Sequence, residues 1–119
     1  VSPFLFFSFM AFPLISAKIL KRNGSMVDFD GEKIKNAIAK AAAIVGELEA
    51  DLPERMTEKI LRLLDEHYFQ PEKAVGVEEV QDIVEIVLMR SGQLKIAKQY
   101  ILYRAEHKEI REKKQEEVV

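Results

Sequence analysis

The hydrophobic and polar positions of the chain follow two different periods, which predict where strands and helices lie. Between residues 18 and 30, short apolar runs flank Asn23 and Gly24, a dipeptide typical of tight β-hairpin turns. From residue 31 onward, apolar residues recur every three or four positions, which is the period of an amphipathic helix. We therefore expect an α+β domain in which a small β-hairpin cap covers a bundle of about four helices.

Two registers are open for the hairpin. A two-residue turn at Asn23 and Gly24 pairs Arg22 with Ser25, whereas a three-residue loop with a left-handed Gly24 pairs Lys21 with Ser25. A shift by one residue moves every side chain to the other face of the strand. The register therefore determines which side chains share a face of the hairpin. The three-residue loop places four side chains on one face: Ile19, Lys21, Val27 and Phe29.

The helices are expected over about 31–45, 53–69, 77–90 and from 94 past 110, with a short third strand near 74–75. Asp30 is a favourable N-cap for the first helix, and Gly46 stands where a C-terminal glycine belongs. Pro53 suits the first turn of the second helix. The expected core stripes of the first three helices are Ile34, Ala37, Ile38, Ala41 and Val45; Met56, Ile60, Leu63, Leu64 and His67 or Tyr68; and Val80, Ile83, Val84, Val87 and Leu88. In the fourth helix Ala97, Tyr100, Ile101, Arg104 and Lys108 lie in line.

Two groups of charged residues have the pattern of solvated helix surfaces. The first group is the run 104–117, and the second is the set of carboxylates Glu78, Glu79, Asp82 and Glu85. We expect residues 18–108 to form the folded domain and residues 109–119 to form a charged helical tail.

Residues 1–17 differ from the rest, because they carry no charge and include five phenylalanines. They lack the basic start of a signal peptide, are interrupted by Pro3 and Pro13, and barely reach the length of a membrane-spanning helix. We expect this N-terminal extension to be an over-extended start, rather than a membrane anchor or a segment that packs on a partner. We assign it no function.

Composition narrows the classes of function. The chain of 119 residues carries 18 basic and 20 acidic residues, a net charge of −2, which argues against a protein dedicated to coating nucleic acid. It has no cysteine, so thiolate zinc sites, iron–sulfur clusters and thiol catalysis are excluded within it. The absence of cysteine is compatible with the cytoplasmic location that we expect. His67 has only helix neighbours that do not face it, and we expect neither a metal site nor a catalytic residue.

The strongest candidate for chemistry is a basic cluster where the hairpin meets the first helix. Residues 18–40 hold six basic and three acidic residues, a local excess that favours a small anion. Lys21 and Arg22 end a strand beside a helix start, where backbone N–H groups and the helix dipole also attract anions, and Lys33 adds a third cation. No P-loop or other glycine-rich phosphate motif is present. The alternative is an ordinary basic turn with ion pairs to Asp28 or Glu32.

Three stretches resemble the ATP-cone domain, a regulatory nucleotide-binding module of ribonucleotide reductases, of their zinc-ribbon repressor and of some phosphoglycerate kinases. They are 18–38, which opens the domain, 77–85 in the third helix and 97–104 in the last helix. The resemblance implies a three-stranded cap over a helical bundle, with ATP or dATP, accompanied by Mg²⁺, bound between them. It also favours the three-residue hairpin loop.

By position, the resemblance implies phosphate contacts from Lys21, Arg22 and Lys33. It implies a base or sugar wall of Ile19, Val27, Phe29 and Ile34, with Asp30 beside the phosphates as a helix cap or through Mg²⁺. Val77, Val80 and Gln81 would border the pocket, and Tyr103 and His107 would close it. Val27, Asp30 and Val77 depart from the Glu, Asn and Thr of some members, and His107 stands where Lys or Arg is common. These departures imply weaker or less selective binding.

The leading hypothesis is therefore a non-catalytic, nucleotide-sensing regulatory module that shifts an assembly equilibrium. Its expected partners are the nucleotide and either a second copy of the chain or a larger enzyme or regulator. The chain is either a free-standing ATP-cone or a piece of a larger protein. The alternatives are a helical protein-interaction or DNA-associated module that has lost the nucleotide, and an accessory part of a kinase or reductase.

Overall fold

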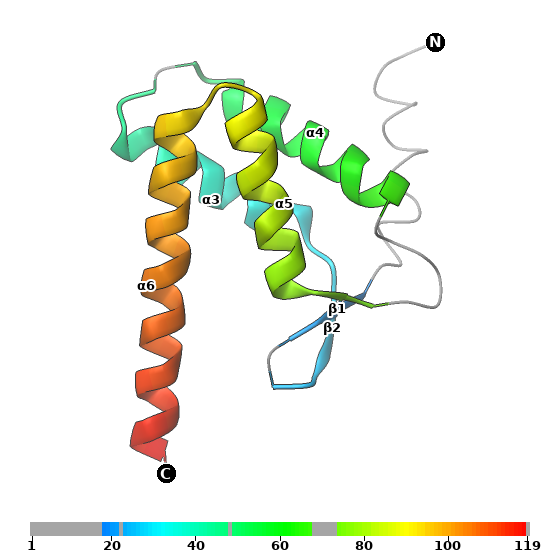
Figure 1. The fold of residues 1–119 in the computed structure, drawn as a ribbon, viewed down its shortest axis with the longest axis vertical. Coiled ribbons are helices and arrows are strands. Elements are labelled where there is room, and N and C mark those ends of the chain that lie inside the picture. Colours follow the sequence, from blue (N-terminus) through cyan, green and yellow to red (C-terminus); the bar gives the residue numbers. More distant parts are fainter. Residues whose placement is uncertain (1–17, 22, 48, 68–73, 119) are drawn as a thin grey trace.

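The computed structural model describes residues 18–21, 23–47, 49–67 and 74–118, with side chains described as far as residue 114. Its elements, in chain order, are β1 (Lys18–Leu20), β2 (Met26–Asp28), α3 (Gly31–Ile44), α4 (Leu52–His67), β3 (Val75–Gly76), α5 (Val77–Arg90) and α6 (Leu94–Val118). The small sheet lies at one end of the helices, next to the start of α5, while α6 extends as the longest helix (Figure 1). The α+β fold with a sheet and four helices is the one predicted.

The hairpin adopts the three-residue loop. Ile19 pairs with Val27 and Leu20 with Met26 in an antiparallel ladder, and the Lys21 N–H donates to the Ser25 carbonyl at 2.9 Å. Gly24 has a φ of +87°, a left-handed conformation that glycine adopts without steric cost. The side chains of Ile19, Lys21 and Val27 therefore share one face of the hairpin.

The third strand connects the hairpin to α5. The sheet order is β2-β1-β3, and β1 and β3 are parallel, with Ile19 opposite Val75 and Leu20 opposite Gly76. Because Lys21 follows β1 and Val77 follows β3, this register brings Lys21 beside the first residue of α5. The predicted strand at 74–75 is thus displaced by one residue, and it determines which helix end lies against the hairpin.

The ends of α3 are fixed by the two residues that the sequence predicts. Asp30 is the N-cap, and its carboxylate accepts a hydrogen bond from the Glu32 N–H at 3.0 Å. At the other end Gly46 has a φ of +79°. Its N–H donates to Ala43 and the Glu47 N–H donates to Ala42, which together form a Schellman C-cap.

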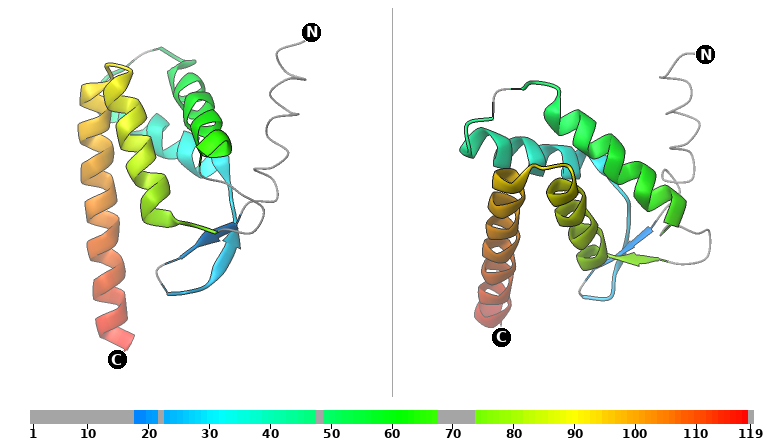
Figure 2. Two further views of the ribbon diagram at one scale, coloured as in Figure 1. Left: turned by 45° about the vertical axis from the view of Figure 1, so that its right-hand side comes forward. Right: turned by 45° about the horizontal axis from the view of Figure 1, so that its top comes forward.

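The core lies between the four described helices and the inner face of the sheet, and each of the first three helices contributes most of its predicted stripe. Figure 2 shows α3 and α4 crossing over the ends of α5 and α6. The most fully buried side chains are Ile38, Leu52, Met56, Ile60, Leu64, Val75, Val84, Leu88 and Ile96. The outer side of the hairpin is exposed, with Met26 51 % accessible, so the sheet is a one-sided cap.

Two positions in line with the predicted stripes are exposed instead of buried. His67 is exposed at the end of α4, near the Glu66 carboxylate at 3.7 Å, and the buried stripe of α4 ends at Leu64. Ile101 is 40 % exposed, because the buried side of α6 is centred on Ile96, Ala97 and Tyr100 instead. The predicted helix end at Phe69 and the alternative core residue Tyr68 lie outside the described residues.

The predictions for residues 1–17 also fall on a segment outside the described residues. Among the helices that the structure describes, none combines the length and apolar character needed to cross a membrane.

Candidate functional site

A cavity of about 260 Å³ lies between the sheet and the helices, open to solvent on one side. Four parts of the fold form its wall: the hairpin with the residues that follow it, the first two turns of α3, the first turns of α5, and one face of α6. The lining residues are Ile19, Lys21, Val27, Asp28, Phe29, Asp30, Lys33, Ile34, Ala37, Val77, Val80, Gln81, Tyr100, Tyr103, Arg104, His107 and Arg111. The mixture of apolar and aromatic walls with a few polar groups is typical of small-molecule sites.

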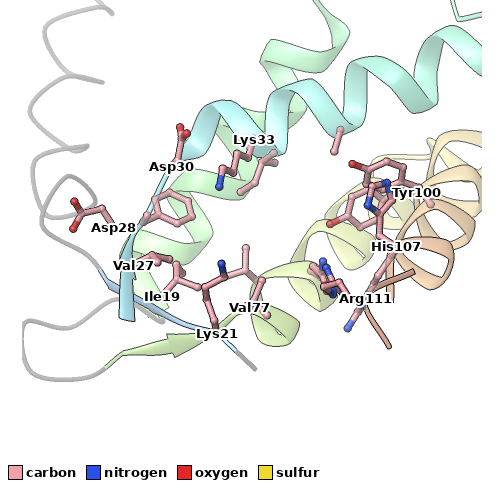
Figure 3. Close-up of a pocket in the computed structure, with 17 residues that line it drawn as sticks. Ile19, Lys21, Val27, Asp28, Asp30, Lys33, Val77, Tyr100, His107 and Arg111 are labelled. Carbon is pink, nitrogen blue, oxygen red and sulfur yellow. The ribbon is translucent and has the colours of Figure 1, made fainter. Parts of the chain in front are cut away.

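Basic side chains enter this cavity from opposite sides. Lys21 and Lys33 point their amines into the space from the hairpin and α3, and His107 and Arg111 face it from α6 (Figure 3). Neither Lys21 nor Lys33 forms an ion pair within the part of the chain that the structure describes. Two lysines without a carboxylate partner, in one cavity, form a site that attracts an anion.

The two acidic residues of the cavity wall are already engaged elsewhere. Asp28 forms an ion pair with Lys18 across the hairpin, and its carboxylate points away from the cavity (Figure 3). The Asp30 carboxylate caps α3. Neither carboxylate therefore neutralises Lys21 or Lys33, and the cavity retains its positive charge.

The helix terminus beside the cavity differs from the one we expected. The first helix, α3, has its N-terminus occupied by Asp30, as described above. The N-cap of α5 is Gly76, which has no side chain to bond the first N–H groups. This uncapped end follows β3 and lies beside Lys21, so α5 rather than α3 offers backbone N–H groups to an anion.

Gln81 lines the cavity and carries a buried polar atom that has no partner among the described residues. The Gln81 side-chain oxygen is buried and accepts no hydrogen bond from the described residues. A buried acceptor without a partner costs about 1–3 kcal/mol, which a hydrogen-bond donor on a ligand would relieve. Close by on α6, the Tyr103 and His107 rings lie 4.1 Å apart between centroids and are tilted by 43°.

Arg104 links α6 to α5 at the edge of the cavity. One guanidinium nitrogen donates to the Asp82 carboxylate at 2.7 Å and to the Glu85 carboxylate at 2.8 Å; we call these three residues the Arg104 cluster. Burial lowers the pKa of the Arg104 guanidinium, but the hydrogen bonds to both carboxylates outweigh it and leave the pKa above its ordinary value. Burial raises the pKa of the neighbouring Tyr100 hydroxyl, so Tyr100 stays neutral.

This cluster corrects two predictions of solvated charge. Glu85 was expected on an exposed carboxylate face, and Arg104 at the start of a solvated helix end. The Arg104 and Glu85 side chains are each only 19 % exposed. Both positions face the contact between α5 and α6, where mutual neutralisation allows burial. From Ala105 to Lys114 every side chain is exposed, as predicted for the remainder of the run.

The structure brings twelve of the thirteen predicted site residues around this one cavity; Arg22 lies outside the described residues. Sequence reasoning missed five lining residues: Asp28, Ala37, Tyr100, Arg104 and Arg111. Tyr100 lay in line with the apolar positions of the last helix, and Arg104 began a charged run interpreted as solvated. Arg111 follows Tyr103 and His107 at a spacing of four residues, which is the signal that could have found it.

Comparisons with known proteins give this arrangement a family. A protein-family model described as "ATP cone domain" matches residues 17–109. The chain is 32 % identical over 111 residues to a ribonucleoside-diphosphate reductase subunit alpha of Chlamydia muridarum, which covers 87 % of the chain and 11 % of that protein. It is 37 % identical over 103 residues to a vitamin B12-dependent ribonucleoside-diphosphate reductase of Thermoplasma acidophilum, covering 82 % of the chain and 13 % of that protein.

An anaerobic ribonucleoside-triphosphate reductase of Salmonella typhimurium is 32 % identical over 96 residues, covering 81 % of the chain and 13 % of that protein. The chain thus spans about a tenth of the length of these relatives. The match includes the hairpin, the cavity-lining turns of α3 and α5, and α6 as far as residue 109. The chain therefore belongs to the ATP-cone family of nucleotide-binding regulatory domains.

Proposed function

We propose that this chain binds ATP or dATP in the cavity between the sheet and the helices, and that binding regulates a larger assembly. The observation that carries the proposal is the convergence of Lys21 and Lys33 on an apolar-walled cavity in which both nearby carboxylates have other partners. Such a cavity offers one region for phosphates and another for a base.

Each part of the wall receives a role in this proposal. Lys21, Lys33 and the uncapped start of α5 hold phosphate oxygens, because they supply charge-assisted and backbone donors. We also assign Arg22, which lies outside the described residues, to the phosphates. Ile19, Val27, Phe29 and Ile34 form the apolar wall for the base and sugar. Val77, Val80 and Gln81 border the nucleotide on α5, and Tyr103 and His107 close the cavity from α6.

Magnesium enters this proposal with the nucleotide. The described residues hold no cluster of three or more His, Asp or Glu side chains that could bind a metal ion. Mg²⁺ bound to ATP needs few protein ligands, since phosphates and water supply most of its octahedral shell. We assign Asp30 as the carboxylate that would face the Mg²⁺ ion. Because Asp30 caps α3, it would contact the ion through water.

The regulatory role follows from what such a chain can do. Its relatives are reductases whose matched region is about a tenth of their length, and we propose no catalytic residue in this chain. A bound nucleotide regulates only if it binds one state of the assembly better than another. We propose that the second state differs in the contacts of the domain with a reductase-like enzyme or with a second copy.

Isothermal titration of the chain with MgATP tests the proposal directly. We expect saturable heat in the micromolar range and an upward shift in melting temperature, because a ligand that binds only the folded state stabilises it. The absence of both heat and thermal shift at millimolar MgATP and MgdATP would contradict the proposal. It would favour instead a helical module that keeps the fold without the nucleotide.

A further inference from the structure

Arg104 connects two walls of the cavity through a half-shielded contact with Glu85 and a more exposed contact with Asp82. Besides its bonds to Asp82 and Glu85, its second guanidinium nitrogen lies 3.4 Å from the Glu78 carbonyl. An ion pair at 19 % side-chain exposure holds its geometry better than one on the surface, and breaking it leaves an uncompensated charge. The Arg104 cluster therefore fixes how α6 lies against α5.

The cluster stands where the packed part of α6 ends. Before it, Ile96, Ala97 and Tyr100 are buried in the core. After it, every described side chain is exposed. Tyr103 precedes Arg104 by one residue and His107 follows it by less than one turn, and all three line the cavity. A small rotation of α6 at Arg104 would move Tyr103 and His107 relative to the lysines on the opposite wall.

We propose that Arg104 is a positioning residue for nucleotide binding, which acts through Asp82 and Glu85 by fixing α6 so that Tyr103 and His107 face the cavity. This inference rests on the nucleotide-binding function proposed above. One guanidinium and two carboxylates give the cluster a net charge of −1. The cluster as a whole would repel a triphosphate, so its contribution to binding is geometric rather than electrostatic.

The direction in which one substitution changes ATP affinity distinguishes a geometric role from an electrostatic one. Glu85→Gln removes a negative charge from the edge of an anion-binding cavity. Electrostatics alone predicts tighter ATP binding, and so does a freed Arg104 that turns toward the phosphates. A positioning role predicts the opposite, weaker binding by about three- to tenfold, within the range of coupling between contacting residues. Glu79→Gln is the matched control, because it removes the same charge from an exposed position of α5 outside the cluster.

The experiment is titration of the full chain with MgATP for the wild type, Glu85→Gln, Arg104→Gln, the double variant and Glu79→Gln, well below the melting temperature of each. If Arg104 acts through Glu85, the double variant should bind ATP no more weakly than Arg104→Gln alone. Hydrogen exchange without nucleotide gives a second readout: Glu85→Gln should hasten exchange of the amides from Tyr103 to Lys108. Should Glu85→Gln fail to fold, Asp82→Asn at the more exposed carboxylate should show the same direction.

Two results would overturn the inference while leaving the proposed function intact. One is wild-type binding with equal or tighter binding by Glu85→Gln. The other is a further large loss when Arg104→Gln is added to Asp82→Asn and Glu85→Gln together, because Arg104 then has neither carboxylate of the cluster to act through and must contact the nucleotide directly. A wild type that binds neither MgATP nor MgdATP would instead refute the proposed function, and this inference with it.

Discussion

At the scale of single residues, Lys21 is the side chain on which the phosphate assignment depends most. It directly follows β1, on the cavity face of the hairpin, and its side chain is exposed. Lys21→Ala should weaken MgATP binding by about 1.5–3 kcal/mol, the range for a hydrogen bond to a charged group. The melting temperature should change little, since an exposed lysine packs little. Lys40→Ala, an exposed lysine of α3 that does not line the cavity, is the control in calorimetry. Unfolding of Lys21→Ala with unchanged affinity of the folded fraction would make Lys21 structural.

His107 offers a gain-of-affinity test on the opposite wall. His107→Lys places a permanent, longer cation beside the cavity, so ATP should bind more tightly by about 0.2–1 kcal/mol, the range for exposed ion pairs. Loss of the ring contact with Tyr103 offsets part of the gain. The matched control is His67→Lys, the same change at an exposed site on α4 outside the cavity. Equal effects of the two substitutions in calorimetry would mean that only net charge matters.

At the scale of elements, the end of α3 depends on one glycine. Gly46 has a φ of +79°, and a Cβ there would meet no atom within 4 Å, so a substitution is opposed by backbone strain alone. Gly46→Ala should lower the free energy of unfolding by roughly 1 kcal/mol, because L-residues resist the left-handed region. Gly46→Asn should cost less, since asparagine tolerates that region. Urea denaturation measures the free energy of unfolding of both variants. Equal values for the two would show that the left-handed conformation of residue 46 does not determine the loss of stability.

The elements also show where sequence reasoning succeeds and where it ends. The helices were predictable because caps such as Asp30 and Gly46 and apolar stripes act over a few residues. Most site residues were assigned through the family resemblance rather than through physics, since a basic hairpin alone left an ordinary turn open. Arg104 and Glu85 were missed because their contact joins positions 19 residues apart in the chain. No local pattern distinguishes a charge on a solvated face from one that two helices bury together.

At the scale of the whole molecule, the folded unit should not require the N-terminal extension. The family match begins at residue 17 and β1 at Lys18, and the core cluster of the described residues is formed by elements from β1 onward. Deleting residues 1–17 should therefore leave the melting temperature and MgATP affinity essentially unchanged. Circular dichroism and calorimetry on the shortened chain check this. A large loss of stability would show that the phenylalanines of residues 1–17 pack on the domain.

The whole site, finally, must distinguish a nucleotide from a bare polyanion. If the cavity wall around Phe29 holds the base, ATP should bind better than inorganic triphosphate, because stacking on an aromatic ring contributes about 1–3 kcal/mol per base. Phe29→Ala should then reduce ATP affinity while leaving triphosphate affinity unchanged.

Salt provides the second axis of this test. Triphosphate would be held by charge alone. It should therefore lose more of its affinity than ATP as ionic strength rises and the screening length becomes shorter. A competition series of ATP against triphosphate at two salt concentrations, with the wild type and Phe29→Ala, measures both effects. Equal affinities with equal salt dependence would mean that the cavity is an anion site without base recognition. The chain would then have the ATP-cone fold without selecting a nucleotide. Its lysines would bind any polyphosphate, with an affinity set by the ionic strength.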